Sequence, residues 1–237
     1  MSARRFGVVV AAGAGQRLGS EQPKAFVDLG GTPLLVHSAR AMAAVCSRII
    51  VVVGDGHVDQ GATSLAAAGI DATLCVGGAT RTDSVCAGLL ACHGLGARPN
   101  DLVGVHDAAR PLASVELIGR TFAAAGDGWD ATAPGLPVVD TLKLVDEDDA
   151  VLRTVDRRGL WTVQTPQVFR WAMLEHVYLR KCPETSTDDL GLVERAGCRV
   201  RLIPGETTNL KITYSQDLAM AEALLRGRQA PAGGDRA

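Results

Sequence analysis

The sequence lacks the features that mark several large classes of protein. Its 24 Lys and Arg residues nearly balance 26 Asp and Glu, for a formal net charge of -2. No overall field therefore attracts nucleic acid or a membrane surface, and any anion site must be local. No run approaches the ~18 apolar residues that a membrane-spanning helix needs. We expect a cytoplasmic protein without a nucleic-acid or membrane partner.

The six cysteines form neither a metal pattern nor a disulfide pattern. They stand at positions 46, 75, 86, 92, 182 and 198, without a CxxC pair and with several inside apolar runs. Neither a zinc site nor a disulfide framework is indicated. Such cysteines are typical of small, buried side chains in a reducing compartment.

The amino-terminal stretch MSARRFGVVVAAGAGQ has the arginines, short apolar run and small residues of a secretory signal. Only FGVVVAA within it is truly apolar, and the rest of the chain is typical of a cytoplasmic protein. We therefore expect this run to form the first buried strand.

Apolar, β-branched stretches alternate with helical stretches along the chain. Strands are predicted at 6–12, 48–53, 72–76, 101–106 and 129–139. Helix start signals lie between or after them: Thr32 and Pro33 before 34–45, Ser114 before 115–125, and Ser215 before 216–226. The alternation predicts an α/β three-layer sandwich with a mostly parallel, Rossmann-like sheet. In such folds ligands gather beyond the carboxyl ends of the strands.

One stretch breaks this alternation. Residues 138–163 contain two predicted strands around the acidic turn DEDD, with no helix after the first. A two-stranded ribbon is marginal alone, so we expect the arm at 138–160 to pack on another subunit. Residues 1–227 are predicted to form one domain that includes this arm, and the polar tail at 228–237 is predicted to be disordered.

The first strand leads into a glycine-rich loop, AAGAGQRLGSEQPKAF, which carries Arg17 and Lys24. A dinucleotide fingerprint would need a third glycine where Leu18 stands, and Pro23 opposes an early helix. A Walker loop would need a Gly-Lys-Ser/Thr ending, which is missing. A dinucleotide site is therefore disfavoured but stays open, and two further interpretations remain. Either the loop amides and its two cations hold a triphosphate, or the loop is a plain turn with solvated cations.

The pattern G-x-G-x-R followed by P-K resembles nucleotidyltransferases of the sugar-nucleotide type. Six further segments narrow the resemblance: GGATRTDSV, VHDAARP, DTLK, TVDRRGLWTVQTPQVF, STDDLGLVERAG and NLKIT. In order and spacing they resemble the 2-C-methyl-D-erythritol 4-phosphate cytidylyltransferases of the non-mevalonate isoprenoid pathway. The resemblance runs from about Val8 to Leu225.

This resemblance implies a homodimer, joined through the arm, that transfers CMP from CTP to methylerythritol phosphate and releases pyrophosphate. It also implies Mg²⁺ or another divalent cation. The nucleophile is an ionised phosphate oxygen, so the chemistry needs positive charge around the α-phosphorus and no general base. By resemblance the catalytic cations are Arg17, Lys24 and Lys211. His106 is interpreted as structural.

The resemblance also implies the binding residues. Those for the nucleotide are Ala11, Ala12, Gly13, Ala14, Gly15, Gly78, Ala79, Ser84, Asp107 and Ala108. Those for methylerythritol phosphate are Arg110, Thr141, Arg157, Thr165 and Thr187, with Thr141 and Arg157 reaching across the dimer. Asp107 is the expected metal ligand, because Mg²⁺ takes one or two carboxylates plus phosphate oxygens.

Structural roles stay open for several of these residues. Asp107 can pair with Arg110 to pin its loop, and Arg81 and Asp83 can cap the next helix. Thr187 can equally be the N-cap of the helix that follows it.

Other activities also stay open. One alternative is a cytidylyltransferase for another polyol phosphate such as ribitol 5-phosphate, although TVDRRGLW and HDAARP favour the isoprenoid enzyme. Two alternatives belong to other functional classes: a nicotinamide-dependent oxidoreductase, and a protein that binds a nucleotide as a sensor without enzymatic activity.

Overall fold

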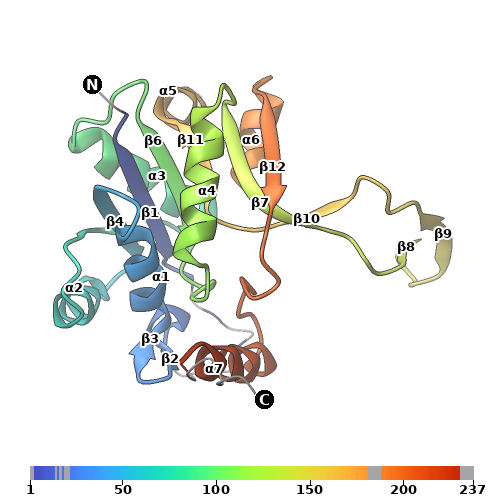
Figure 1. Ribbon diagram of the computed structural model, residues 1–237, viewed down its shortest axis with the longest axis horizontal. Coiled ribbons are helices and arrows are strands. Elements are labelled where there is room, and N and C mark those ends of the chain that lie inside the picture. Colours follow the sequence, from blue (N-terminus) through green and yellow to red (C-terminus); the bar gives the residue numbers. More distant parts are fainter. Residues whose placement is uncertain (1–2, 14, 16–17, 19–21, 181–187, 230–237) are drawn as a thin grey trace, which may run out of the picture.

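The computed structural model describes residues 3–13, 15, 18, 22–180 and 188–229. An eight-stranded sheet forms its centre (Figure 1). Four parallel strands follow one another across it: β5 (Thr73–Val76), β4 (Arg48–Val53), β1 (Arg5–Ala11) and β6 (Leu102–Asp107). The antiparallel β11 (Gln167–Arg170) separates β6 from β7 (Ala131–Pro137), which also pairs with β10 (Trp161–Val163) and β12 (Val200–Pro204). The predicted, mostly parallel α/β sheet is confirmed.

Helices cover both faces of the sheet. One face packs against α1 (Leu34–Ala43), α2 (Val58–Ala67) and α4 (Val115–Gly126). The other packs against α3 (Arg81–Gly94), α5 (Trp171–Leu174), the π-helix η3 (Glu175–Arg180) and α6 (Leu190–Arg195). No helix in the described part of the chain is long and apolar enough to cross a membrane.

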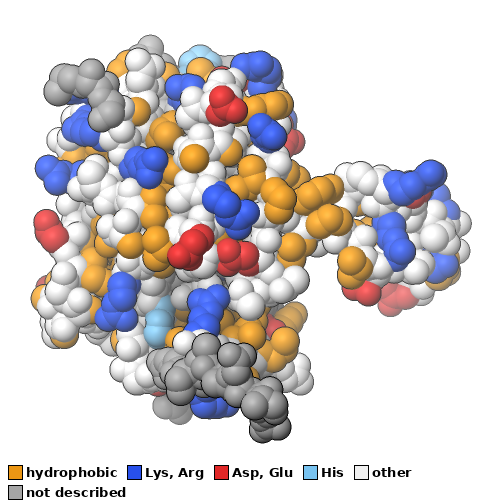
Figure 2. Space-filling view, viewed as in Figure 1, with side chains coloured by type: hydrophobic (Ala, Val, Ile, Leu, Met, Phe, Trp, Pro, Cys, Tyr) orange, Lys and Arg blue, Asp and Glu red, His pale blue; other side chains and the backbone are white. Residues whose placement is uncertain are grey.

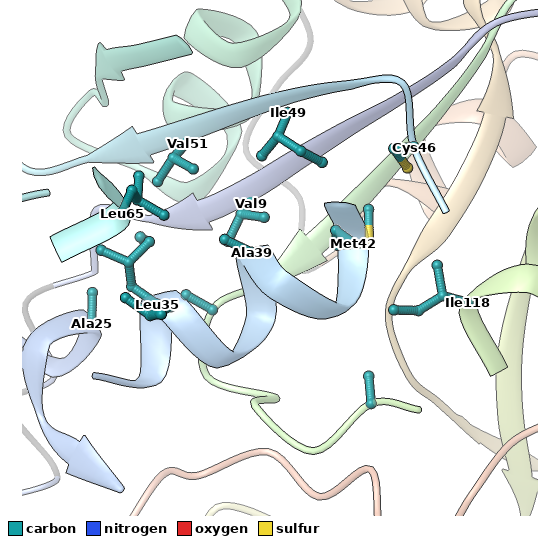
Figure 3. Packing of buried hydrophobic residues seen from close by; sticks show 14 of the residues in the cluster. Val9, Ala25, Leu35, Ala39, Met42, Cys46, Ile49, Val51, Leu65 and Ile118 are labelled. Carbon is teal, nitrogen blue, oxygen red and sulfur yellow. The ribbon is translucent and has the colours of Figure 1, made fainter. Parts of the chain in front are cut away.

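The two faces explain the continuous apolar runs of the strands. Val9 of β1 belongs to the hydrophobic cluster beneath α1, whereas the next residue back, Val8, belongs to the cluster beneath α3. Figure 3 shows the first cluster, where Val9 and Val51 meet Leu35 and Ala39 of α1. Because both faces are buried, these strands read as nearly continuous apolar runs instead of alternating apolar and polar positions.

A third cluster lies at the carboxyl ends of the parallel strands. It joins Leu29 of the short hairpin β2 (Asp28–Leu29) and β3 (Thr32–Pro33) to Ile212 and to Ala221 of α7 (Ser215–Gln229). In Figure 1 α7 lies beside β2 and β3 at this end of the sheet. The cluster therefore fixes the chain on either side of Lys24 and Lys211.

The helix starts were only partly predicted. Ser114 caps α4 as expected, because its hydroxyl accepts a hydrogen bond from Leu117 N at 3.0 Å. Thr32 and Pro33 were wrongly predicted as cap and first helical residue, since both lie in β3 and Pro33 holds the cap position without a side-chain bond. Ser215 is the first residue of α7 rather than its cap. Asp217 accepts instead from the N–H groups of residues 213 and 214.

Helix α7 continues to Gln229, so the first two residues of the predicted tail are helical. Residues 230–237 lie outside the described part of the chain. The predicted burial of the cysteines holds for Cys46 and Cys92, and this burial raises the pKa of each thiol to about 12. Cys75, Cys86 and Cys198 are only half-buried, and Cys182 is not described.

The predicted arm is present. Strand β8 (Leu142–Val145) pairs antiparallel with β9 (Val151–Val155), and the ribbon stands clear of the body (Figures 1 and 2). Val139, Val151 and Leu152 are 76%, 60% and 60% exposed. Figure 2 shows hydrophobic side chains along the stem of the arm and charges of both signs at its tip. Within one chain the arm has no core of its own.

Candidate active site

A cavity of about 610 Å³ opens at the carboxyl ends of β1 and β6. Its volume lies within the range of pockets that hold small molecules. Eleven predicted site residues line it: Ala11, Ala12, Gly13, Gly15, Lys24, Gly78, Ala79, Ser84, Asp107, Ala108 and Lys211. Ala14 and Arg17 lie outside the described residues. The cavity therefore lies at the carboxyl edge of the sheet, where a ligand was expected.

The glycine-rich loop closes tightly on Lys24. Gly15 has φ +68°, and a Cβ at this position would lie 2.5 Å from Cβ of Lys24. Only glycine fits, because it has no side chain and adopts positive φ without strain. Lys24 then begins the 3-10 helix η2 (Lys24–Phe26), where Phe26 is buried and stacks on His57 at 5.6 Å. The lysine thus rises from an anchored turn at the cavity.

The second loop of the cavity lies between β5 and α3. Thr80 and Asp83 form a capping box, in which each side chain accepts a hydrogen bond from the backbone N–H of the other. The alternative that Asp83 caps this helix is confirmed. The Ser84 hydroxyl donates to the Thr80 carbonyl at 3.0 Å and accepts from Gly78 N at 3.2 Å. Ser84 therefore shapes the loop that presents the Gly78 and Ala79 backbone to the cavity.

Asp107, the last residue of β6, holds the centre of the site. Its Oδ2 lies 2.7 Å from Nζ of Lys211, and its Oδ1 lies 3.3 Å from Nη2 of Arg81. Burial alone would raise the pKa of this carboxyl, but the charges of Arg81 and Lys211 outweigh it and hold the pKa well below its usual range. Asp107 is thus a carboxylate at neutral pH.

Arg110 was predicted as a substrate contact, with pairing to Asp107 as the alternative. Its guanidinium instead donates to the carbonyls of Asn209, at 2.8 Å, and Val163, at 3.3 Å. The ion pairs of Asp107 among the described residues are made by Arg81 and Lys211, while Arg110 attracts this carboxylate from farther away and donates its backbone N–H to the Asp107 carbonyl at 2.9 Å. Arg110 lies behind the cavity lining and ties together two segments of backbone.

A buried chain of hydrogen bonds lies beneath Asp107. The Thr165 hydroxyl accepts from Asp107 N at 3.1 Å and lies 2.9 Å from Nδ1 of His106. Nε2 of His106 lies 3.2 Å from the Arg110 carbonyl, which only accepts, so Nε2 carries the proton and Nδ1 accepts from Thr165. Burial lowers the pKa of His106 to about 4. His106 is neutral and structural as interpreted, and the Thr165 hydroxyl donates to His106 and accepts from Asp107 N.

Two further predicted substrate residues, Thr141 and Arg157, are not among the described residues that line the cavity of their own chain. Thr141 and Arg157 are exposed on the arm, where the Arg157 guanidinium donates to the Val139 carbonyl. Figure 1 shows the arm directed away from the body. Thr187 lies outside the described residues, and α6 begins at Leu190 with Asp189 in the cap position.

Sequence reasoning missed two residues of the site. Arg81 was considered only as a helix-terminal residue, yet it lines the cavity and bridges Asp107 to Asp189. Asp189 received no role. The signal for this ion pair was the pair of acidic residues at 188 and 189. A buried carboxylate needs a cation as its partner, and Arg81 of the RTD segment is such a cation.

Cations gathered around one fixed carboxylate, at the carboxyl edge of a parallel sheet, suit an enzyme that handles polyphosphates. Together with the glycine-rich loop they define the class of nucleotidyltransferases. The family model for 2-C-methyl-D-erythritol 4-phosphate cytidylyltransferase matches residues 6–227.

Relatives of the same name agree with this match. One from Rhodococcus jostii is 44% identical over 220 residues, which cover 92% of this chain and 93% of the relative. One from Dechloromonas aromatica is 40% identical over 230 residues, covering 95% and 99%. The crystal structure of the Thermus thermophilus protein is 37% identical, with a TM-score of 0.76 over 95% of this chain and 100% of that one.

The chain belongs to the 2-C-methyl-D-erythritol 4-phosphate cytidylyltransferase family. It is an enzyme, a cytidylyltransferase of the non-mevalonate isoprenoid pathway. This membership decides against the nicotinamide oxidoreductase that the glycine-rich loop left open.

Proposed function

We propose that the chain transfers CMP from CTP to 2-C-methyl-D-erythritol 4-phosphate, giving 4-diphosphocytidyl-2-C-methyl-D-erythritol and pyrophosphate. The observation that carries this proposal is the meeting of Lys24, Lys211 and Asp107 in one cavity of nucleotide size. The names of the relatives support the identity of the second substrate.

The reaction needs positive charge that offsets the negative charges of the phosphates more than it needs proton transfer. An ionised phosphate oxygen of methylerythritol phosphate attacks the α-phosphorus, and the bond to the β-phosphate oxygen breaks with its electron pair leaving on pyrophosphate. Lys24 and Lys211 reduce the repulsion between two polyanions and stabilise the charge that develops on the leaving group. His106 is buried and neutral, which supports a mechanism without a general base.

The nucleotide base would lie against small side chains. Ala11, Ala12, Gly78 and Ala79 line one part of the cavity and leave the main chain accessible. A pyrimidine fits such a space better than a purine, and backbone N–H and C=O groups would read its edge. Ser84 acts here by holding the Gly78 backbone.

Asp107 fits a Mg²⁺ ion that arrives with the triphosphate. It is the one carboxylate among the described residues that line the cavity, and Mg²⁺ commonly takes one or two carboxylates with phosphate oxygens and waters. Among the described residues no cluster of three His, Cys, Asp or Glu could hold a metal without such a substrate. When bound, the ion would neutralise charge on the phosphates.

The arm is proposed to complete the site of a second subunit. Thr141 and Arg157 would hold the phosphate of methylerythritol phosphate there, for which the forked guanidinium of Arg157 is suited. Two observations support a homodimer through the arm: the ribbon stands clear of its own body, and its apolar side chains are exposed.

Pyrophosphate release tests the proposal directly. We expect release with CTP, MgCl₂ and methylerythritol phosphate, and little release when EDTA replaces the metal or ATP replaces CTP. Faster turnover of ribitol 5-phosphate would replace the proposed substrate. Binding of CTP without pyrophosphate release from any polyol phosphate would instead indicate a sensor.

A further inference from the structure

Arg81 lies between two carboxylates that belong to different parts of the fold. Its Nη2 lies 2.8 Å from Oδ2 of Asp189 and 3.3 Å from Oδ1 of Asp107. Arg81 begins α3, Asp107 ends β6, and Asp189 precedes α6. One guanidinium therefore connects the cavity to a layer of the fold behind it.

Asp189 is anchored more firmly than any reaction at the cavity requires. It is fully buried, and the hydroxyl of Tyr178 donates to its Oδ1. Its backbone N–H donates to Oε1 of the buried Gln167 at 3.0 Å, and the N–H of Leu190 donates to the same oxygen at 3.1 Å. The carboxylate of Asp189 is thus held by Tyr178 and Arg81, and its backbone is held by Gln167 of β11.

The second cationic partner of Asp107 is held differently. The Lys211 side chain is 45% exposed, against 24% for Arg81, and it contacts the other oxygen, Oδ2. Asp107 therefore has a fixed partner on Oδ1 and a more exposed partner on Oδ2. Lys211 can therefore leave Oδ2 and contact the phosphates when a polyphosphate enters, whereas Arg81 stays on Oδ1.

We propose that Asp189 is a positioning residue that holds Arg81 against Oδ1 of Asp107, so that Oδ2 is presented to the cavity. The proposal rests on the proposed function, because it assigns Oδ2 to the nucleotide and its metal. Without Asp189 the forked guanidinium is free to grip both oxygens of Asp107 or to turn towards the phosphates. Either movement misplaces the carboxylate at the reaction centre.

Asp189→Asn and Tyr178→Phe test the anchor, because both keep the shape of the side chain. We expect Asp189→Asn to lower kcat/KM for CTP by about 10- to 100-fold, the loss typical for residues that orient a metal ligand. Tyr178→Phe should act in the same direction but less strongly. Calorimetric titration with CTP and MgCl₂, without the second substrate, should show weakened binding in parallel.

Val193→Ala is the matched control. Val193 is buried in α6 within the same hydrophobic cluster as Tyr178, and its apolar side chain takes no part in the hydrogen bonds that hold Asp189. Val193→Ala should lower the melting temperature while changing kcat/KM by less than about 3-fold, because it removes apolar packing around α6 and leaves the charges near Asp189 unchanged. Equal losses of activity in Val193→Ala and Asp189→Asn at equal melting temperature would overturn the proposal.

A double-mutant cycle with Arg81→Met separates positioning from stability. If Asp189 acts through Arg81, adding Asp189→Asn to Arg81→Met causes no further loss of kcat/KM, and it improves folding because the unpaired carboxylate is removed. Additive losses would overturn the proposal. If Arg81→Met does not fold, Arg81→Gln, which also removes the charge, serves in the same cycle.

The proposed function is tested separately by the wild-type protein. An inactive wild type would defeat the activity, while the CTP titrations would still report on the anchor. An active wild type with unaffected Asp189 and Tyr178 variants would defeat the anchor alone.

Discussion

Nζ of Lys211 lies 2.7 Å from Oδ2 of Asp107, although 104 residues separate the two in the sequence. The segment that carries Lys211 is held by one buried side chain, Gln164, and one half-buried side chain, Arg110. Gln164 Nε2 donates to the Glu206 carbonyl, and Arg110 Nη1 donates to the Asn209 carbonyl, each at 2.8 Å. The position of a cavity cation thus depends on polar residues that never reach the cavity.

Lys24→Ala should lower turnover by at least about 100-fold, because it removes a preorganised charge at the reacting phosphates. The fold should persist, since η2 is anchored by the buried Ala25 and Phe26. Steady-state pyrophosphate release measures the effect. Arg48→Ala is the control, because Arg48 is exposed at the opposite end of β4. Near-normal turnover of Lys24→Ala would contradict the placement of the triphosphate.

Asp107→Asn should raise the Mg²⁺ concentration needed for half-maximal activity and lower kcat by about 100-fold, because it removes the charge of the proposed metal ligand. The fold should survive, because Arg81 keeps its bond to Asp189 and Lys211 is exposed enough to be hydrated. Titration of activity with MgCl₂ checks this expectation, with the exposed Asp71→Asn as the control. An unchanged metal requirement would remove Asp107 from the metal site.

Most of the architecture followed from local patterns. The runs that became β1, β4 and β6 are apolar on both faces, which is the pattern of a covered parallel sheet, and the acidic turn marked the arm. Strands β10 and β11 were missed because they are three and four residues long and lack a periodic signal of their own.

The site residues were predicted where a local motif or the family resemblance marks them, and Arg81 and Asp189 were missed because only tertiary packing brings them together. Lys24 could be found from its glycine-rich loop, which lies close to it in the sequence. The contact of Arg81 with Asp189 spans 108 residues and depends on the packing of α3 beside η3 and α6, which no local pattern encodes. Thr165 stays a predicted substrate contact, and the sequence alone did not show that its hydroxyl also bonds a buried histidine.

Asp101→Asn should destabilise the protein at pH 7 by about 1–3 kcal/mol, the cost of weakening buried bonds to a charged group. The Asp101 carboxylate accepts from Arg4 N and Arg98 N, both at 2.9 Å, and pairs with the Arg4 guanidinium. Burial raises the pKa of Asp101, but these hydrogen bonds outweigh it and lower the pKa below its ordinary value. Solvent screens part of the effect, because Arg4 is 35% exposed.

The pH dependence of this effect has a definite sign. The Asp101 carboxylate takes up a proton at a higher pH in the unfolded chain than in the folded protein. Its contribution to the free energy of unfolding is therefore complete above about pH 4 and is lost as the pH falls through the lowered pKa of the folded protein. Urea unfolding between about pH 7 and about pH 2.5 should therefore show the gap between wild type and Asp101→Asn narrowing below about pH 4. A gap that stays constant over this range would contradict the assignment.

Arg157→Ala should raise KM for methylerythritol phosphate by about 10-fold or more while leaving KM for CTP nearly unchanged, because it removes a bidentate phosphate contact. Arg158→Ala is a close control, since Arg158 is the next residue and its guanidinium is paired with Asp156. Initial rates with each substrate varied in turn provide the measurement. A change confined to the CTP constant would show that the arm serves another part of the reaction.

Mixing the two impaired variants, assayed with methylerythritol phosphate well below its raised KM, tests whether the arm acts on a partner. If Arg157 serves the cavity of the other subunit, a heterodimer of Lys24→Ala and Arg157→Ala contains one cavity with both side chains intact. Mild unfolding and refolding of an equal mixture should then restore activity well above that of either variant alone. If Arg157 serves its own cavity, every cavity in the mixture lacks one of the two residues and no activity returns. Sedimentation of each variant alone is the control. If both variants sediment as dimers, a lack of restored activity means that Arg157 serves the cavity of its own chain.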